Sequence, residues 1–184
     1  MNDENKLMDD TRRWVEEAVI GLNLCPFAKA VQARGQIRYT LSQARDPEAL
    51  TAELLAALHD LAAADPEQLD TILLIHPFVL EDFAEYNDYL DIVDMIIEAE
   101  GYEGVLQVAS FHPDYQFADS PAADRANYTN RSPYPMLHLL REDSISRAVD
   151  SLPDPASVYQ RNMRVLRDLP QDEFARIWGP RPER

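Results

Sequence analysis

The sequence predicts an α/β fold in which helices flank a mostly parallel sheet of four strands, as a two-layer or three-layer sandwich. Short apolar runs of strand type alternate along the chain with longer segments of helical spacing, an order typical of parallel sheets joined by crossover helices. The last strand follows a long polar segment instead of a helix, so its direction is left open. The four expected strands lie near residues 36–42, 71–75, 105–111 and 136–140.

The first third of the chain predicts helices before and after the first strand. Apolar residues from Trp14 to Leu22 recur at helical spacing, and Asp10 or Thr11 can cap this helix. Pro26 suits the first position of a second helix, which places Cys25 at or beside its N-cap. Alternating apolar residues then predict the strand near 36–42. Asp46-Pro47 begins a third helix, because aspartate caps helices and proline is tolerated in the first turn.

The remainder of the chain repeats this alternation. The continuous apolar run Thr71–Ile75 predicts a central strand covered on both faces. Helical spacing follows from Asp82 to Ile97, and the strand near 105–111 comes next. After the strand near 136–140, Asp154-Pro155 is expected to start a helix, and a short helix is expected at Asp172–Trp178.

Composition restricts the partners. The 184 residues are expected to form one domain, 1–184, with flexible ends at 1–9 and 180–184. The net charge of −16 argues against nucleic acid and anionic membranes as partners. The polar N-terminus lacks the features of a secretory signal, no apolar run is long enough to cross a bilayer, and the single cysteine cannot form an internal disulfide. These features favour the cytoplasm; the oligomeric state is not predicted.

The segment from Val108 to Arg141 is the expected site. It is long and polar, and its formal charge is zero within this acidic chain. Long loops without secondary structure are often functional. His76 ends the second strand and His112 ends the third. If these strands run parallel, both histidines share with the segment the sheet edge at which ligands tend to bind.

Three residues are candidates for catalysis. His112 can act as a general base with Asp114 as its orienting partner, because alternate residues of an extended chain point the same way. The structural alternative is that Asp114 caps the turn while His112 hydrogen-bonds the loop. Cys25, at a helix start, can be a reactive thiolate, although packing as a small apolar residue is the more common role.

The same segment offers groups for binding an anion. Arginine forks bind carboxylate and phosphate, so Arg131 and Arg141 are candidate substrate ligands. The alternative is that these arginines pair with nearby carboxylates and only hold the loop in place. Asn127 and Asn130 add neutral hydrogen-bonding groups, and Tyr128 and Tyr134 can stack on a planar ligand. No close-spaced histidine or cysteine pattern predicts a metal site, and no particular cofactor is indicated.

Three stretches of the chain carry a family resemblance: Trp14-Val15-Glu16 with Gly21–Ala28, Ala109–Phe117, and Asn127–Pro135 with Leu137–Glu142. They resemble a family of bacterial and plastid proteins known only as a domain of unknown function. The resemblance covers nearly the whole chain and implies a complete single-domain member of that family. It brings no activity with it, so no catalytic role is transferred.

The sequence therefore favours an enzyme of the hydrolase or transferase class that acts on a small anionic substrate bound by residues 108–141. The alternative is a metal-binding or haem-binding regulatory protein without catalysis. A third hypothesis is a protein-interaction module that uses the acidic helix face at Glu81–Glu98.

Overall fold

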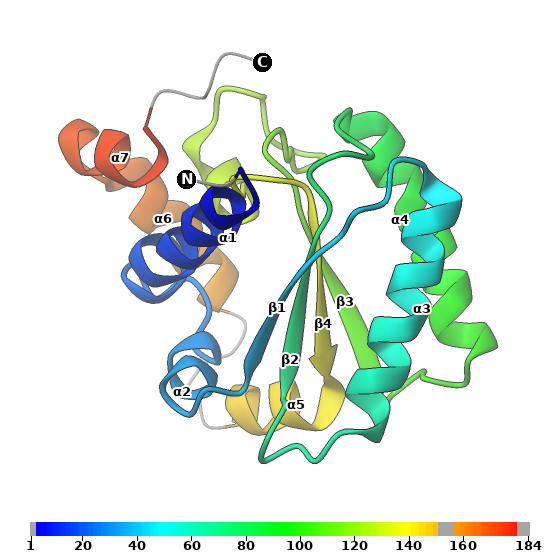
Figure 1. Ribbon diagram of the computed structural model, residues 1–184. Helices are drawn as coiled ribbons and strands as arrows, with labels where there is room; N and C mark the ends of the chain where they lie inside the picture. Colours follow the sequence, from blue (N-terminus) through cyan, green and yellow to red (C-terminus); the bar gives the residue numbers. More distant parts are fainter. Residues whose placement is uncertain (1–2, 151–156, 180–184) are drawn as a thin grey trace.

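A four-stranded sheet lies between two layers of helices in the computed structural model, which describes residues 3–150 and 157–179 (Figure 1). The strands are β1 (Ile37–Leu41), β2 (Thr71–Ile75), β3 (Leu106–Phe111) and β4 (Met136–Arg141). The α-helices are α1 (Asp3–Trp14), α2 (Ala28–Ala33), α3 (Pro47–Ala63), α4 (Phe83–Ala99), α5 (Glu142–Asp150), α6 (Ser157–Asp168) and α7 (Gln171–Trp178). A π-helical segment, η1 (Val15–Ile20), continues α1, and a 3₁₀ segment, η2 (Arg125–Thr129), lies in the long loop.

The sheet is mixed, so the prediction of a mostly parallel sheet was wrong. The strand order is β1-β2-β4-β3, with β1 parallel to β2 and β4 antiparallel to both of its neighbours. The loop from His112 to Pro135 leaves β3 and enters β4 at one sheet edge, where Phe111 pairs with Met136. Such a connection returns the chain in the opposite direction, whereas a parallel pair needs a crossover. The strands β2 and β3 both oppose β4 and therefore point the same way.

Alternation along the two central strands builds a core on each face of the sheet. Ile72 and Leu74 of β2 pack with α3 and α4, whereas Leu73 and Ile75 pack with α1 and α7. All five residues of β2 are buried, as expected for a strand covered on both faces. The arrangement is thus a three-layer sandwich, with α5 lying below the sheet in Figure 1.

Local capping explains where two of the helices begin. The Asp46 side chain accepts a hydrogen bond from the Ala49 N–H, and Pro47 occupies the first turn of α3. The Asp82 side chain accepts from the N–H groups of Ala84 and Glu85 at the start of α4. Both starts agree with the sequence because a cap is set by a few neighbouring residues.

The N-terminal helix begins earlier than the sequence predicted. Residues 3–9, which were expected to be flexible, belong to α1, and Asp10 and Thr11 lie inside it instead of capping it. Thr11 is fully buried and its hydroxyl donates to the Leu7 carbonyl, while Met8 packs in the core on this face. Residues 1–2 and 180–184, also expected to be flexible, and the helix start expected at Asp154-Pro155 lie outside the described residues.

Of the helices in residues 3–150 and 157–179, none combines the length and apolar character needed to cross a membrane.

Candidate functional site

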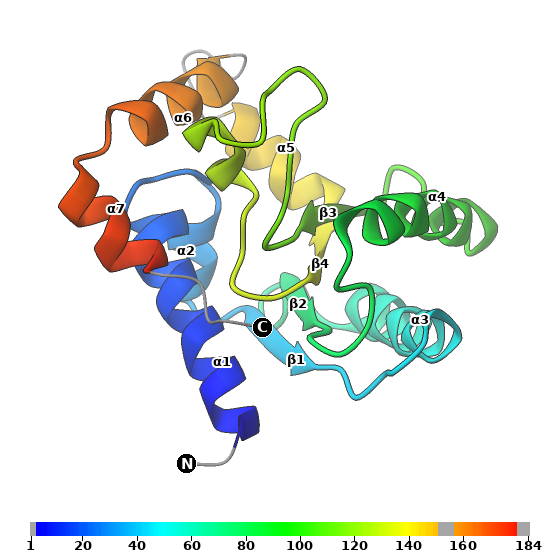
Figure 2. The ribbon, with the colours of Figure 1, turned by 90° about the horizontal axis from the view of Figure 1, so that it is seen from above.

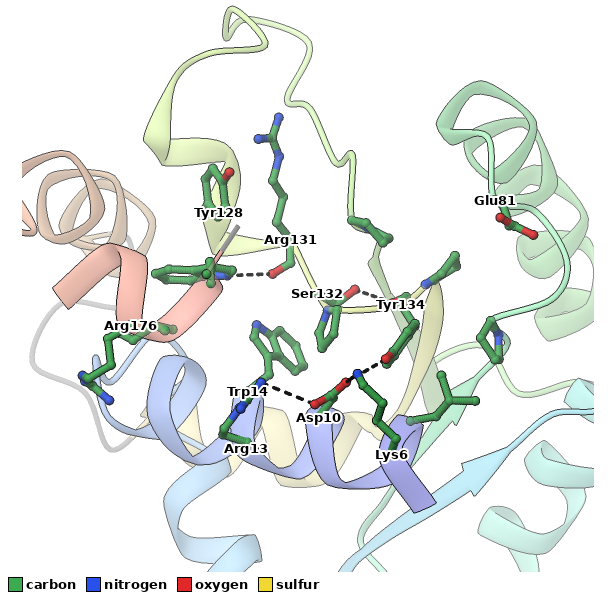
Figure 3. A pocket seen from close by; sticks show the side chains of 18 of the residues that line it. Lys6, Asp10, Arg13, Trp14, Glu81, Tyr128, Arg131, Ser132, Tyr134 and Arg176 are labelled. Atoms are coloured by element: carbon green, nitrogen blue, oxygen red, sulfur yellow. Dashed lines mark hydrogen bonds and ion pairs between the residues drawn. The ribbon is translucent and has the colours of Figure 1, made fainter. Parts of the chain in front are cut away.

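A cavity of about 600 Å³ opens at the sheet edge where β2 and β3 end and β4 begins. Its walls come from α1, the turn after β2, the segment 128–135 and α7. Seen from above, the segment leading into β4 runs between α1 and α7 on one side and the start of α4 on the other (Figure 2). The residues drawn in Figure 3 surround this space.

Three polar side chains of α1 reach the cavity because they are spaced by four and three residues on one helix face. They are Lys6, Asp10 and Arg13. The Asp10 carboxylate accepts hydrogen bonds from Lys6 Nζ at 2.5 Å, from the Tyr134 hydroxyl at 2.8 Å and from Arg13 Nη2 at 3.4 Å. Asp10 is therefore the centre of a polar cluster that joins α1 to the segment before β4 (Figure 3).

The protonation of this cluster follows from its contacts. Burial opposes the charged form of Asp10, but hydrogen bonds from Lys6 and Tyr134 outweigh it and lower the carboxyl pKa. The hydrogen bond to Asp10 raises the pKa of Lys6. Burial, and then the neighbouring Asp10, raises the pKa of Tyr134. At neutral pH the cluster consists of a carboxylate, an ammonium group and a neutral phenol whose hydroxyl donates a hydrogen bond to the carboxylate.

Trp14 forms the part of the wall where α1 changes to π-helical geometry. Its side chain is only 5% exposed and packs edge-on against Phe111, with ring centroids 5.4 Å apart. π-helical segments are rare and occur frequently at functional sites. The segment ends at Gly21, where a Cβ atom would come within 2.3 Å of the Glu17 carbonyl oxygen. A residue without a side chain is therefore needed at this helix end.

A cluster of aromatic side chains forms the part of the cavity wall beside α7. The Tyr128 ring meets Phe174 and Trp178 edge-on at centroid distances of 4.7 and 5.2 Å. The Trp178 indole N–H donates to the Arg131 carbonyl at 3.4 Å. Arg176 of the same helix also lines the cavity and pairs with Glu17 at 2.9 Å. The last described helix thus contributes both a flat apolar wall and a guanidinium group.

One known protein family matches almost the whole described part of this chain. A family described as "Protein of unknown function (DUF1415)" matches residues 6–176. The chain belongs to this family. Searches of curated proteins and of solved structures found no match.

Tyr128, Arg131 and Tyr134 are the residues predicted for binding that line the cavity of this DUF1415 protein. Arg131 is 8% exposed and donates to the Tyr115 and Ala122 carbonyls at 2.9 Å, while its guanidinium lies 4.6 Å from the Tyr128 ring centroid. In Figure 3 this guanidinium points away from Asp10 and Tyr134. Arg131 therefore stabilises the loop, and its contribution to the cavity is mainly to form part of the wall.

The two predicted asparagines hold the loop backbone. Asn127 is fully buried, accepts from the Phe117 N–H and donates to the Pro121 carbonyl. Asn130 donates to the Ser110 carbonyl at 3.0 Å. Each side chain ties the long loop either to itself or to β3. These polar side chains, which led to the prediction of a binding site, instead hydrogen-bond the backbone of a loop that has little secondary structure of its own.

His112 and His76 lie together at the predicted sheet edge. Both pack on the Tyr86 ring of α4, with ring centroids 5.0 and 5.8 Å from it. His112 is fully buried; its Nε2 lies 3.2 Å from the Leu80 carbonyl, and its Nδ1 accepts from the Asp114 N–H at 3.0 Å. With both ring nitrogens engaged by the main chain, His112 is not placed to exchange a proton with a molecule in the cavity.

Arg141 lies at the opposite edge of the sheet from the cavity. Its guanidinium donates to the carbonyls of Leu61, Ala64 and Leu69, where α3 ends and the chain turns into β2. Asp70 lies 3.9 Å away. The structure therefore separates Arg141 from Arg131 and gives it the role of a helix C-terminal cap.

Cys25 lies on the other face of the sheet from His112. It packs near Phe27, Val31 and Leu140, next to α2, whereas His112 contacts α4. Burial raises the pKa of the Cys25 thiol, and the N–H groups of Ala28 and Phe27 oppose this only in part. The thiol form is thus favoured.

Within residues 3–150 and 157–179, no group of three or more His, Cys, Asp and Glu side chains is arranged to hold a metal ion.

Sequence reasoning missed the contribution of the two chain ends. Lys6, Asp10 and Arg13 were assigned to a flexible end or a helix start, and Arg176 and Trp178 to a minor helix. The signal that could have found them is the repeat of polar residues on the face that carries Trp14, because residues three and four apart share a helix face.

Proposed function

We propose that this DUF1415 protein binds a small anionic molecule with a planar or apolar part in the cavity, and that it acts on that molecule as a hydrolase or transferase. The size and position of the cavity support the proposal. Its volume of about 600 Å³ falls within the range of small-molecule sites. It also opens beyond the carboxyl ends of β2 and β3, where ligands of α/β proteins commonly bind.

The charge of the lining is the observation that carries the anionic assignment. The charged side chains of the wall are four basic ones, Lys6, Arg13, Arg131 and Arg176, and two acidic ones, Asp10 and Glu81. The whole chain has the opposite balance, with 17 basic and 33 acidic residues. Basic residues concentrated in a cavity of an acidic protein favour an anionic occupant, since a cation would meet repulsion at close range.

Arg13 and Arg176 are the basic groups best placed to contact that anion. Their side chains are 63% and 57% exposed, so they can turn toward a ligand without breaking a buried network. Lys6 is similarly exposed but is held closely by Asp10, at 2.5 Å, and Arg131 is held by the loop carbonyls. Tyr128 and Trp178 offer aromatic surface for the planar part of the molecule.

Tyr134 and Asp10 are the groups we assign to proton transfer. The Tyr134 phenol lines the cavity, and Asp10 and Lys6 adjoin it. The Tyr134 hydroxyl donates to Asp10, so it would turn from Asp10 to give its proton to a leaving group. The ammonium group of Lys6 would then offset the repulsion between the phenolate and Asp10. These groups take the place of His112 and Asp114 because they border the cavity.

Intrinsic fluorescence tests the binding step directly. The chain has two tryptophans, Trp14 and Trp178, and both line the cavity. We expect aromatic carboxylates or phosphates to change the emission in a saturable way, and neutral analogues to do so more weakly. Arg13→Gln should weaken binding about tenfold, because a charge-assisted hydrogen bond is lost.

The neighbouring Arg12 provides the matched control. It lies on the same helix, but its guanidinium lies over the Tyr39 ring at 5.4 Å and it is not part of the cavity wall. Arg12→Gln should leave the affinity unchanged. Equal effects of the two substitutions would contradict an anion site in the cavity.

The catalytic step has its own test. Once a ligand is identified, Tyr134→Phe should reduce its turnover by about 10²-fold or more while leaving its binding nearly intact. Turnover retained by Tyr134→Phe would refute the assigned proton donor without affecting the binding proposal.

A further inference from the structure

A second, smaller cavity lies behind Trp14 on the face of the sheet covered by α1 and α2. Its volume is about 50 Å³, and Trp14 belongs to the walls of both cavities. The wall is otherwise made mostly of apolar side chains from η1, α2 and the sheet. Thr71, His138 and Cys25 are the exceptions. This cavity is therefore different in chemistry from the basic one at the sheet edge.

Hydrogen bonding determines which nitrogen of His138 carries the proton. The Thr71 hydroxyl lies 2.5 Å from the Leu139 carbonyl oxygen, which can only accept, so the hydroxyl proton points there. The same hydroxyl oxygen lies 2.7 Å from His138 Nε2. With its proton already used, the oxygen must accept from Nε2–H. Thr71 thereby holds His138 in the tautomer whose Nδ1 is unprotonated.

His138 Nδ1 is an acceptor that the protein leaves open. No group in the described part of the chain pairs with it, and the ring forms part of the cavity wall. Burial lowers the pKa of His138 to about 4, and burial raises the pKa of Cys25. Both groups are consequently neutral near pH 7, and the cavity presents one acceptor in an apolar, uncharged surrounding.

We propose that this second cavity is a binding site for a small neutral molecule that has an apolar body and one O–H or N–H group, which donates to His138 Nδ1. An ion is excluded because nothing in the wall would compensate its lost hydration. The volume limits the occupant to roughly three or four non-hydrogen atoms. A short alcohol fits these requirements. The site is independent of any anion in the first cavity.

A pair of probes with the same carbon skeleton tests the proposal on the wild-type chain. Propan-2-ol offers a donor, whereas acetone offers only an acceptor. The chain has four histidines and one cysteine, so the ring ¹⁵N signals of His138 and the ¹³Cβ signal of Cys25 can each be followed by NMR. We expect propan-2-ol to shift both signals in a saturable manner, and acetone to bind at least about fivefold more weakly.

His138→Leu removes the acceptor and replaces the imidazole with an apolar side chain of similar bulk. In this variant the Cys25 signal should respond to both probes equally. Thr71→Val removes the hydroxyl that holds the tautomer and should also reduce the preference for the alcohol. Because the wild-type comparison needs neither variant, the proposal stays testable even if one of them does not fold.

Two results would overturn the proposal. Equal saturable binding of both probes by the wild-type chain would show an apolar cavity in which His138 accepts nothing. Shifts that only grow linearly with concentration would show that no site exists for such molecules. Neither result would bear on anion binding in the first cavity, which is read by different probes.

Discussion

At the scale of single residues, His112 shows how a side chain suited to catalysis can serve the backbone. Its two ring nitrogens engage the Leu80 carbonyl and the Asp114 N–H, and its ring packs against Phe83 and Tyr86. These contacts join the turn after β2 to the end of β3. The imidazole thus connects two loops that border the cavity, and its loss should be felt in stability.

We expect His112→Ala to lower the free energy of unfolding by about 3 kcal/mol, because it removes two buried hydrogen bonds and leaves a void beside Tyr86. Urea unfolding followed by circular dichroism measures this change. His59→Ala, at an exposed position, is the control and should change the free energy by less than about 0.5 kcal/mol. An unchanged unfolding free energy together with lost turnover would instead support the catalytic role expected from the sequence.

Two other histidines should make the folded state sensitive to acid. Burial lowers the pKa of His76 and of His138 to about 4, compared with about 6.5 in an unfolded chain. Between these values the unfolded chain binds protons that the folded chain does not, so stability falls as the pH drops below 6.5. At pH 5 each histidine should lower the free energy of unfolding by about 2 kcal/mol relative to pH 7.5.

His76→Asn separates this effect from the titration of carboxylates. His76 Nδ1 lies 3.0 Å from the Val79 carbonyl, and an asparagine amide can donate to the same oxygen. Urea titrations at pH 7.5 and pH 5 give the free energy of unfolding at each pH. The difference between these two free energies should be about 2 kcal/mol smaller in the variant than in the wild type. The same difference in both proteins would mean that His76 is not the responsible group.

At the scale of secondary structure, the elements that could be predicted are those determined by neighbouring residues. Asp46 and Asp82 cap α3 and α4 because the cap and the N–H groups it binds are adjacent in sequence. α1 was missed over its first turns because its buried face includes Thr11, a polar residue that interrupts the apolar pattern. The direction of β4 depends on where a long loop returns, and no local pattern encodes that.

Arg141 belongs to this scale because it completes the end of a helix. Arg141→Met keeps the side-chain stem but removes the hydrogen bonds to Leu61, Ala64 and Leu69 and the positive charge near Asp70. We expect a loss of about 3 kcal/mol in unfolding free energy, measured by urea titration, with ligand binding in the cavity unchanged.

An exposed arginine of the same sheet serves as the control. Arg38 pairs with Asp60 at the surface, and Arg38→Met should cost no more than about 1 kcal/mol. Weaker ligand binding in Arg141→Met, without a change in stability, would instead favour the substrate-binding role that the sequence indicated for this residue.

At the scale of the whole molecule, the cavity could be predicted only in part. The cavity opens at the sheet edge that the sequence indicated, because β2 and β3 run in the same direction even though β4 separates them. Three of the residues predicted for binding, Tyr128, Arg131 and Tyr134, line the cavity. Lys6 and Trp178, however, are far apart in the sequence and line the same cavity only because of tertiary packing. No sequence pattern connects residues so far apart.

The net charge of −16 leads to a prediction about how a ligand reaches the cavity. An anion approaching from solution first meets the repulsive field of the whole protein, and only within contact range does it meet Arg13 and Arg176. Salt screens interactions beyond the Debye length, which is about 10 Å at 0.1 M, and affects close pairs less. The association rate constant of an anionic ligand should therefore rise about threefold between 10 mM and 150 mM salt.

Stopped-flow tryptophan fluorescence measures this rate, and a neutral amide analogue of the ligand provides the control, whose rate should not change with salt. For most binding between opposite charges the rate falls as salt is added. A falling rate here would mean that the basic lining extends its attraction beyond the cavity mouth and governs the approach. A rising rate would mean that the lining acts only at contact, where it selects an anion that the rest of the surface repels.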